Sequence, residues 1–439
     1  MTALSLSLTL LNDIEASGKY VNLALNSHLL DNVSADERRR VTALLYTTLE
    51  RKLTIDYYIC TLANRSLSDI DAGTLNILRL GACQIVYMDS VPDYAAVNES
   101  VALGRNKGEK AFVNALLRSL SRAKESDTLP MPNREKSPQR FLSVKYSFPL
   151  WICKMFYSLY GEAGAEAILD RFNSAQYTDI VVNTTKITKA EYRKILEDAR
   201  IYPTDSDYSR LTLRIPHSVN PTALPHFDDG YFFVQDTACS ASAIALGAKS
   251  GERVVDTCAC PGGKSFATSI LMEGGGEILS LDLHSSKLSL ITEGARRLGL
   301  NNITARQCDA TEPISDMLGT FDKVICDVPC SGLGVLGKKA DMRYSRSRCD
   351  IDALPSLQLE ILEKSVGYLK PCGEIIYSTC TLNPQENEEV VNTFLSRHSD
   401  FELVPFELEN GEKCQGMFTF VPHIHHTDGF FLAKLKKTH

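Results

Sequence analysis

The sequence predicts a chain of three parts: an all-helical part, a small α+β module, and an α/β domain with a mostly parallel sheet. Apolar residues recur at spacings of three and four up to about residue 128, which is the period of an amphipathic helix. Residues 146–235 mix one helical run with short strand-like runs, and from residue 236 apolar strands alternate with turns and helical stretches. The chain has 439 residues, of which 44% are hydrophobic, so it is long enough for more than one core.

The first two parts are separated by a linker. Runs such as VTALLYTTLERKLTIDYYI and ESVALGRNKGEKAFVNALLRSL predict an all-helical domain over residues 1–128. The stretch PMPNREKSPQR holds three prolines, several basic residues and almost nothing to bury, which predicts a basic linker over residues 129–145. The helical run LWICKMFYSLYGEAGAEAILDRF and the strand-like runs DIVVNT and YFFVQ then predict the α+β module, residues 146–235.

The α/β domain is predicted over residues 236–439, with strands at RVVD, EILSLD, ITARQ, FDKVICD and GEIIYST. Aspartates stand at or just after the ends of four of these strands: Asp256, Asp282, Asp309 and Asp327. One such aspartate is commonly only a helix N-cap. Four in succession favour a ligand site, because ligands of parallel sheets bind beyond the carboxyl ends of the strands.

A glycine turn follows the first strand of this domain. It consists of Cys258, Ala259, Cys260, Pro261, Gly262, Gly263 and Lys264. It leads into a helix, whose free N–H groups can approach a ligand closely, but it matches neither the dinucleotide pattern nor the P-loop pattern. Asp282 can accept hydrogen bonds from ribose hydroxyls and Asp309 can accept one from an adenine amino group. The sequence therefore predicts a cofactor that contains a nucleoside.

Two cysteines are predicted to lie at the same edge of the sheet: Cys330 in DVPCSGLG and Cys380 in YSTC. Two thiols beside a nucleoside cofactor suit methyl transfer to cytosine C5, because C5 becomes nucleophilic only after a thiolate has added to C6. The adduct must later lose its C5 proton and release the base, which needs a second group. Asp327 is a candidate to hydrogen-bond the cytosine amino group or N3. Spacing alone leaves the roles of the two cysteines interchangeable.

Charge and cysteine content narrow the class of protein. The net charge is -7, yet residues 101–150 hold ten Lys and Arg against four acidic residues, which fits either a solvated helix face or an RNA-binding surface. Residues 338–348 hold five basic residues and are expected to contact RNA phosphates. Thirteen cysteines without a C-x-x-C pair predict reduced thiols and no metal site. The lack of a signal-like start and of a long uncharged apolar stretch predicts a cytoplasmic protein with no membrane partner.

These motifs closely resemble those of the RsmB/Sun (Fmu) family of ribosomal RNA cytosine-C5 methyltransferases, within the NOL1/NOP2/Sun superfamily. The resemblance rests on CACPGGK, Asp282, CDA at 308–310, DVPCSGLG, YSTCTLNPQENE, FVQD at 233–236 and DGFFLAKL at 428–435. The stretch YAAVNESVALGRNKGEKAFVNALLRSL is similar to a NusB-type RNA-binding helical domain. The resemblance thus covers nearly the whole chain.

The resemblance implies a NusB-like domain, a small α+β RNA-binding module and a Rossmann-like methyltransferase domain that acts on C5 of a cytidine in 16S ribosomal RNA. It implies S-adenosyl-L-methionine as the cofactor, held by residues 258–264, Asp282, Asp309 and Asp327. It also implies that Cys380 is the nucleophile and that Cys330 assists release. Lys264, beside the two glycines, is expected to serve the cofactor or the active site.

Two alternatives stay open from the sequence. A transfer RNA cytosine-C5 methyltransferase would use the same chemistry, although the helical front domain argues against it. A non-catalytic RNA-binding or antitermination factor would fit the helical domain and the basic block, but it would not need both cysteines. Asn383, Pro384 and Glu386 are interpreted as a turn and helix start after Cys380.

Overall fold

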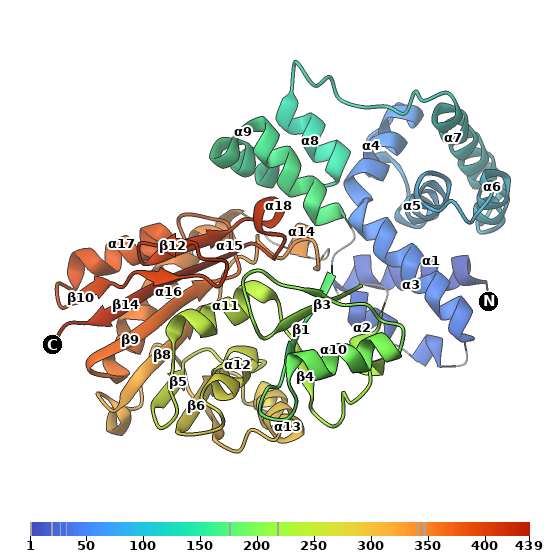
Figure 1. Ribbon diagram of the computed structural model, residues 1–439. Coiled ribbons are helices and arrows are strands. Elements are labelled where there is room, and N and C mark those ends of the chain that lie inside the picture. The colour runs from blue at the N-terminus through green and yellow to red at the C-terminus, as the bar shows by residue number, and fades with distance from the viewer. Residues whose placement is uncertain are drawn as a thin grey trace. The chain divides into compact units, whose positions relative to one another are not determined.

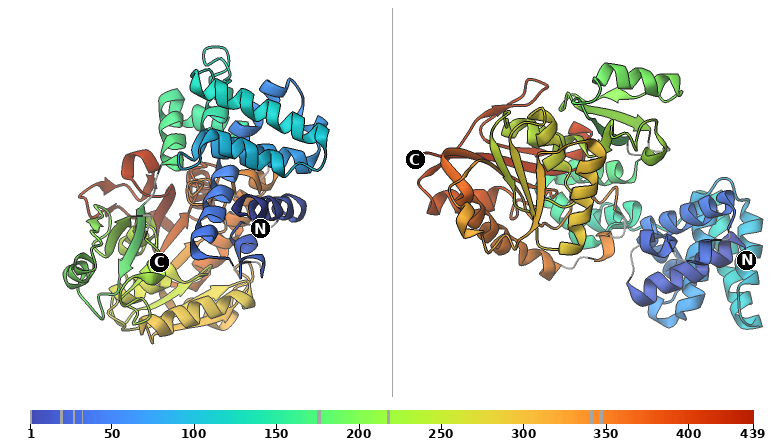
Figure 2. Two further views of the ribbon diagram at one scale, coloured as in Figure 1. Left: turned by 90° about the vertical axis from the view of Figure 1, so that its right-hand side faces the viewer. Right: turned by 90° about the horizontal axis from the view of Figure 1, so that it is seen from below.

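The computed structural model describes residues 2–18, 21–26, 28–31, 33–174, 177–216, 219–339, 342–345 and 348–439. The chain forms two compact units. The helical unit comprises Met1–Asn173 with Lys339–Ser345, and the sheet unit comprises Ser174–Lys338 with Arg346–His439. Figures 1 and 2 show helices in the first unit and the β-sheets in the second.

The helical unit is organised around one buried helix. Its helices are α1 (Ala3–Ser17), α2 (Val21–Leu25), α3 (Ala35–Glu50), α4 (Lys52–Ala63), α5 (Ala72–Tyr87), α6 (Asp93–Ala102), α7 (Lys107–Glu125), α8 (Pro138–Tyr146), α9 (Leu150–Asn173) and α14 (Met342–Ser345). Residues 74–85 of α5 are all buried, and α5 packs against α1, α3, α4, α6 and α7. Its buried Arg79 makes two hydrogen bonds to the Asp56 carboxylate, of 2.7 and 2.8 Å, which satisfies the charge inside the bundle.

Helices α8 and α9 extend the helical unit beyond residue 128. Helix α8 begins with Pro138 at its first position, inside the range that the sequence marks as a basic linker. Its Leu142 and Val144 are buried, and it packs against α4 and α9. Helix α9 bends at Gly161, whose φ of 69° is not helical. The α8 helix is short and flanked by prolines and charges, so its apolar residues give no clear helical period in the sequence.

A small antiparallel sheet opens the sheet unit. Its strands are β1 (Tyr177–Val182), β2 (Thr204–Asp205), β3 (Thr212–Pro216) and β4 (Phe232–Val234), in the order β2-β3-β1-β4. Helix α10 (Lys189–Asp198) covers it, because its buried Tyr192 and Leu196 pack with Ile180, Val182 and Phe232 of the strands. The sequence predicts an α+β module over residues 146–235; these strands and α10 lie within that range, but the helix predicted at its start is α9, which belongs to the helical unit.

The large sheet has a parallel core and an antiparallel edge. Its strands are β5 (Arg253–Asp256), β6 (Glu277–Asp282), β7 (Ile303–Gln307), β8 (Phe321–Asp327), β9 (Leu369–Thr379), β10 (Phe401–Leu403), β13 (Met417–Phe420) and β14 (Phe430–Lys437), in the order β10-β14-β9-β8-β5-β6-β7, with β13 beside β14. Strands β5 to β9 pair in parallel, and β14 pairs antiparallel with β9. The strand order reverses between β5 and β8, which is where sheets of this kind bind ligands.

Helices cover both faces of the large sheet (Figure 1). They are α11 (Thr237–Leu246), α12 (Gly263–Leu271), α13 (Leu288–Leu298), α16 (Leu354–Ser365) and α17 (Glu388–Arg397); short helices α15 (Arg348–Asp352) and α18 (Pro422–His425) and the hairpin β11 (Phe406–Glu407) and β12 (Lys413–Cys414) complete the unit. Successive residues of β8 alternate between the faces: Val324 and Cys326 pack with α16 and α17, whereas Ile325 packs with α11. The predicted α/β domain is present, and no described helix is both long and apolar enough to cross a membrane.

Two glycines bring the loop after β8 against the start of β14. A Cβ built on Gly334 would lie 1.9 Å from the carbonyl oxygen of Gly429, and Gly429 N–H donates to the Gly334 carbonyl at 2.8 Å. The loop that carries DVPCSGLG can therefore close only if residue 334 has no side chain.

Gly334→Ala is expected to lower the free energy of unfolding by about 3 kcal/mol, because the added methyl group overlaps backbone that cannot move aside. Gly367→Ala is the matched control in the same unit: its Cβ meets only the flexible end of Leu318, at 3.2 Å, and the cost should stay below about 1 kcal/mol. Urea unfolding followed by circular dichroism measures both. Equal effects of the two substitutions would contradict the close approach.

Candidate active site

The pairing of β8 with β9 brings the two cysteines together. Asp327 at the end of β8 lies opposite Ser378 near the end of β9, so the loops that follow start side by side. The Cys330 and Cys380 sulfur atoms are 3.2 Å apart. The backbone N–H of Cys380 also donates to the Cys330 sulfur at 3.3 Å. Both side chains stay partly accessible, so a substrate can reach the pair.

A buried ion pair lies at the same edge. The Lys264 ammonium is 2.6 Å from Asp327 Oδ2, and the Ser378 hydroxyl donates to Asp327 Oδ1 at 2.7 Å. Burial is the largest single effect and lowers the pKa of Lys264, but the charge and hydrogen bond of Asp327, together with the charges of Cys239 and Asp256, raise it above its usual value. Lys264 also lies 5.1 Å from the centre of the Phe430 ring. Lys264 therefore stays charged and fixes the direction of the Asp327 carboxylate.

Cys380 is a protonated thiol in this arrangement. The hydrogen bond with Cys330, then burial, then the charges of Cys330 and Asp327 raise the pKa of Cys380 well above its usual value, and only Lys264 acts in the opposite direction. A reaction at Cys380 therefore needs an acceptor for its proton. The sulfur of Cys330 is within reach and already accepts the Cys380 N–H.

The glycine turn leaves no room for a side chain at either of its two glycines. Gly262 has a φ of 109°, and a Cβ there would lie 2.5 Å from the Phe266 ring; a Cβ on Gly263 would lie 2.7 Å from the Gln235 amide nitrogen. Helix α12 starts at Gly263, so its first N–H groups face the space beyond β5. Gly262 and Gly263 therefore let the backbone of the turn pack closely against Phe266 and Gln235.

Asp256 ends β5 with an unpaired acceptor. Its Oδ2 accepts the Ser265 hydroxyl at 2.7 Å, while its Oδ1 is buried with no hydrogen-bond partner among the described residues. Burial raises the pKa of Asp256 to about 7. A buried oxygen of this kind fits a donor from a ligand, and a cationic amine suits it best. The strand-end pattern marks Asp256 in the sequence without assigning it a role.

The other two strand-end aspartates hold local turns. Asp282 accepts the N–H of Cys260 at 3.2 Å through Oδ2, which ties the end of β6 to the glycine turn. Asp309 is exposed, and its Oδ1 accepts the N–H and hydroxyl of Thr311 at 2.9 and 2.7 Å. The glycine turn, Asp256, Asp282 and Asp327 thus meet at the carboxyl edge, with Asp309 beyond β7 on the same side.

Lys338 forms two ion pairs within the sheet unit that the sequence does not predict. Its ammonium pairs with Asp236 at 2.9 Å and Asp428 at 2.8 Å, which joins the loop after Cys330 to the FVQD and DGFF motifs. Arg343 is also buried, and its guanidinium lies 4.0 Å from the centre of the Phe148 ring within the helical unit. These two basic residues of segment 338–348 are therefore engaged inside the protein. Ala340, Asp341, Arg346 and Ser347 of that segment lie outside the described residues.

The basic block at 101–150 divides into paired and unpaired residues. Four members are held by carboxylates: Arg105 by Asp71 and Glu109, Lys124 by Asp93, Arg134 by Glu162 and Glu166, and Lys145 by Glu166. Lys107, Lys110, Arg118 and Arg122 are exposed and make no ion pair with the described residues. Their spacings of three, eight and four residues place them on one side of α7, which we call the α7 basic face.

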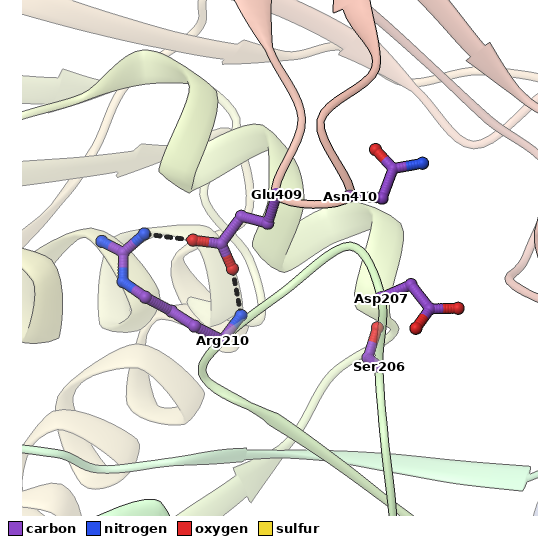
Figure 3. A pocket seen from close by; sticks show the side chains of 5 residues that line it. All are labelled: Ser206, Asp207, Arg210, Glu409 and Asn410. Carbon is purple, nitrogen blue, oxygen red and sulfur yellow. Dashed lines mark hydrogen bonds and ion pairs between the residues drawn. The ribbon is translucent and has the colours of Figure 1, made fainter.

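A hollow on the sheet unit is lined by Ser206, Asp207, Arg210, Glu409 and Asn410 (Figure 3). Arg210 and Glu409 pair across it, and none of the residues predicted for the site lines it. Within the part of the chain that the structure describes, no group of three or more His, Cys, Asp and Glu side chains is arranged to hold a metal ion.

The fold and this edge define the class of protein. A parallel sheet in the order β7-β6-β5-β8-β9, continued by antiparallel β14, with a glycine turn after β5, is the Rossmann-like fold of methyltransferases. Residues 243–436 match the model of the 16S rRNA methyltransferase RsmB/F family, residues 1–122 match the NusB family, and residues 148–221 match the ferredoxin-like domain of RsmF/B-like methyltransferases.

Relatives of known name cover the whole chain. The chain is 33% identical over its full length to a probable ribosomal RNA small subunit methyltransferase B of Synechocystis sp., all of which is covered. It is 34% identical to the protein of the same name in Bacillus subtilis, over 98% of each chain. A solved methyltransferase homologue from Pyrococcus horikoshii matches with a TM-score of 0.60 and 27% identity over 68% of this chain and 99% of its own. The chain belongs to the RsmB/F family of ribosomal RNA methyltransferases, as the sequence motifs predict.

The raised pKa of Asp256 predicts that the stability of the protein depends on pH. Because the folded-state pKa of about 7 lies above the unfolded value of about 3.9, the folded state binds the proton more tightly, so stability falls as the pH rises toward 7. Between pH 5 and 7 this carboxyl should account for about 2 kcal/mol of that fall. Asp256→Asn should remove this contribution to the loss of stability. The measurement is the difference in unfolding free energy between wild type and variant at each pH. A constant difference would contradict the assignment.

Proposed function

We propose that this chain transfers a methyl group from S-adenosyl-L-methionine to C5 of a cytidine in 16S ribosomal RNA, through a covalent bond between Cys380 and cytosine C6. The observation that carries the proposal is the pair of sulfur atoms 3.2 Å apart, beside the Lys264–Asp327 ion pair, at the ligand-binding edge of a methyltransferase fold. The named relatives support the small-subunit RNA as the substrate.

The residues at the strand ends fit this cofactor. The turn 258–264 would take its amino-acid part along the backbone, Asp282 would accept the ribose hydroxyls, and Asp309 would accept the adenine amino group. Asp327 faces the same space, and the unpaired Oδ1 of Asp256 suits the cofactor's ammonium group. Bound there, the cofactor supplies an electrophilic methyl group on a sulfonium.

The first step is addition of Cys380 to the base. Cys380 gives its proton to the Cys330 sulfur, which must be a thiolate to accept it and becomes a thiol, and the Cys380 sulfur bonds to C6. Asp327, directed by Lys264 and Ser378, accepts a hydrogen bond from the cytosine amino group or from protonated N3, and the proton on N3 neutralises the charge that the addition leaves on the ring. C5 then acts as the nucleophile that receives the methyl group.

The second step is release. The C5 proton leaves to a base, the C5–C6 double bond re-forms, and the bond between C6 and the Cys380 sulfur breaks with its electrons returning to that sulfur. We assign this proton transfer to Cys330, once it has passed the first proton to solvent, because its sulfur lies next to the Cys380 sulfur and accepts the Cys380 N–H. This asymmetry supports Cys380 as the nucleophile and Cys330 as the release residue.

The α7 basic face is the surface that we propose for RNA phosphates. Four unpaired charges on one side of a 19-residue helix can follow a phosphate backbone, whereas the paired basic residues nearby have their charge already neutralised. The family match of residues 1–122 to NusB supports this use of the helical unit.

Cys380→Ala is expected to abolish methylation of 16S RNA, by more than about a thousandfold, because the variant lacks the sulfur that is proposed to add to C6. Cys330→Ala should instead leave a covalent RNA–protein species, visible as a slow band on a denaturing gel. Cys372→Ala, which removes an exposed thiol, is the matched control and should behave as wild type. Full activity of Cys380→Ala would exclude the mechanism, and methylation of transfer RNA in place of 16S RNA would exclude the substrate.

Replacing all four residues of the α7 basic face by Gln should weaken RNA binding at least tenfold and reduce the slope of log affinity against log salt by about 3. The control is Arg134→Gln with Lys145→Gln, whose charges are held by Glu162 and Glu166, so the slope should change by less than about 1. Filter binding between low and moderate salt measures both. Equal slopes of log affinity against log salt for the two variants would mean that RNA does not bind the α7 basic face.

A further inference from the structure

We propose that Glu386 is a positioning residue that holds the two cysteine-bearing loops in reacting geometry. The inference rests on the proposed function and deepens it, because it names the group that sets the distance between the nucleophile and the release residue. Glu386 belongs to the stretch interpreted from sequence as a turn and helix start. Its backbone does lie in the turn before α17, but its side chain points elsewhere.

The Glu386 carboxylate binds the loop of Cys330 at two points. It is completely buried. Its Oε2 accepts the backbone N–H of Ser331 at 2.8 Å, and its Oε1 accepts the Ser331 hydroxyl at 2.5 Å. Ser331 directly follows Cys330, so both bonds fix the backbone that carries the Cys330 thiol.

The same carboxylate binds the loop of Cys380. Oε1 also accepts the Asn383 amide at 3.0 Å and lies 3.5 Å from the hydroxyl of Thr381, the residue after Cys380. The Ser331 and Thr381 hydroxyls are 2.7 Å apart, so the residues that follow the two cysteines meet on one carboxylate. Two loops separated by 50 residues in the sequence therefore share one anchor.

Two further bonds fix the anchor itself. The Gln358 amide of α16 donates to Oε2 at 3.0 Å, and the Tyr377 hydroxyl of β9 donates to the Glu386 carbonyl at 2.6 Å. All groups that face the carboxylate in these contacts are donors without formal charge. Such an array needs two acceptor oxygens, because each oxygen receives at least two donors.

Glutamine cannot replace Glu386 at this position. Its side chain has almost the same shape, but its NH₂ group would face either Ser331 N–H with Gln358 or the Ser331 hydroxyl with Asn383. One side of the array must then separate. The loop of Cys330 would move relative to that of Cys380, and both C–S bond formation and proton removal would slow without loss of either thiol.

The distance between the thiols can be tested without RNA or cofactor. Diamide takes two electrons and two protons from a pair of thiols and leaves a disulfide, and its rate depends on how often the two sulfur atoms meet. In wild type the Cys330–Cys380 disulfide should form fast, as mapped by peptide mass spectrometry. In Glu386→Gln it should form at least tenfold more slowly, and kcat for 16S RNA methylation should fall by a similar factor with KM nearly unchanged.

Val390→Ala is the control for loss of stability alone. Val390 is buried on α17 and its apolar side chain has no donor for the Glu386 carboxylate, so its substitution should lower the melting temperature while leaving the disulfide rate and kcat as in wild type. Ser331→Ala is the second variant, which removes only the hydroxyl bonds and keeps the N–H; it should slow the disulfide about threefold.

A wild-type disulfide rate in both Glu386→Gln and Ser331→Ala would overturn the proposal. Slowing of Val390→Ala to the same degree would also overturn it, because a structural role would then suffice. A slow disulfide in Glu386→Gln, together with wild-type protein that does not methylate cytidine, would keep the positioning role and reject the proposed function.

Discussion

Parallel pairing of β8 with β9 is the constraint on which the site depends. The register that sets Asp327 opposite Ser378 lets both strands end at one level of the sheet edge. Cys330 lies three residues beyond Asp327 and Cys380 lies two beyond Ser378, so short loops suffice to bring the thiols together. The Ser378 hydroxyl bonds Asp327 across this pairing. A slip of one residue would turn every side chain of β9 to the opposite face and would separate the pair.

The Lys264–Asp327 ion pair joins the cofactor turn to the base site. Lys264 comes from the start of α12, directly after the glycine turn, while Asp327 ends β8. Burying two charges rarely stabilises a fold by itself. In the proposed reaction the ion pair would orient the base, while the Asp327 charge raises the pKa of Cys380 and the Lys264 charge opposes that rise. In the proposed reaction, addition and release would take place at this one edge of the sheet.

Site features that depend on neighbouring residues can be predicted from the sequence, whereas those that depend on contacts between distant segments cannot. The glycine turn, the strand-end aspartates and the two cysteines are readable because each stands next to its own strand. Spacing does not distinguish the two thiols, because the backbone N–H that reaches the Cys330 sulfur comes from the other loop, at Cys380. Charge counts likewise cannot separate Lys107, which is unpaired, from Arg134, which two glutamates hold. Glu386 resembles an ordinary helix-start acid until its donors are assembled around it.

Trapping the covalent intermediate tests the mechanism most directly. The wild-type protein is incubated with S-adenosyl-L-methionine and 16S RNA that contains 5-fluorocytidine, from which the C5 substituent cannot leave as a proton, so that elimination is blocked after methyl transfer. Peptide mass spectrometry then identifies the residue bound to the base. We expect a methylated adduct on Cys380 alone. An adduct on Cys330, or methylation with no adduct on either thiol, would contradict the mechanism.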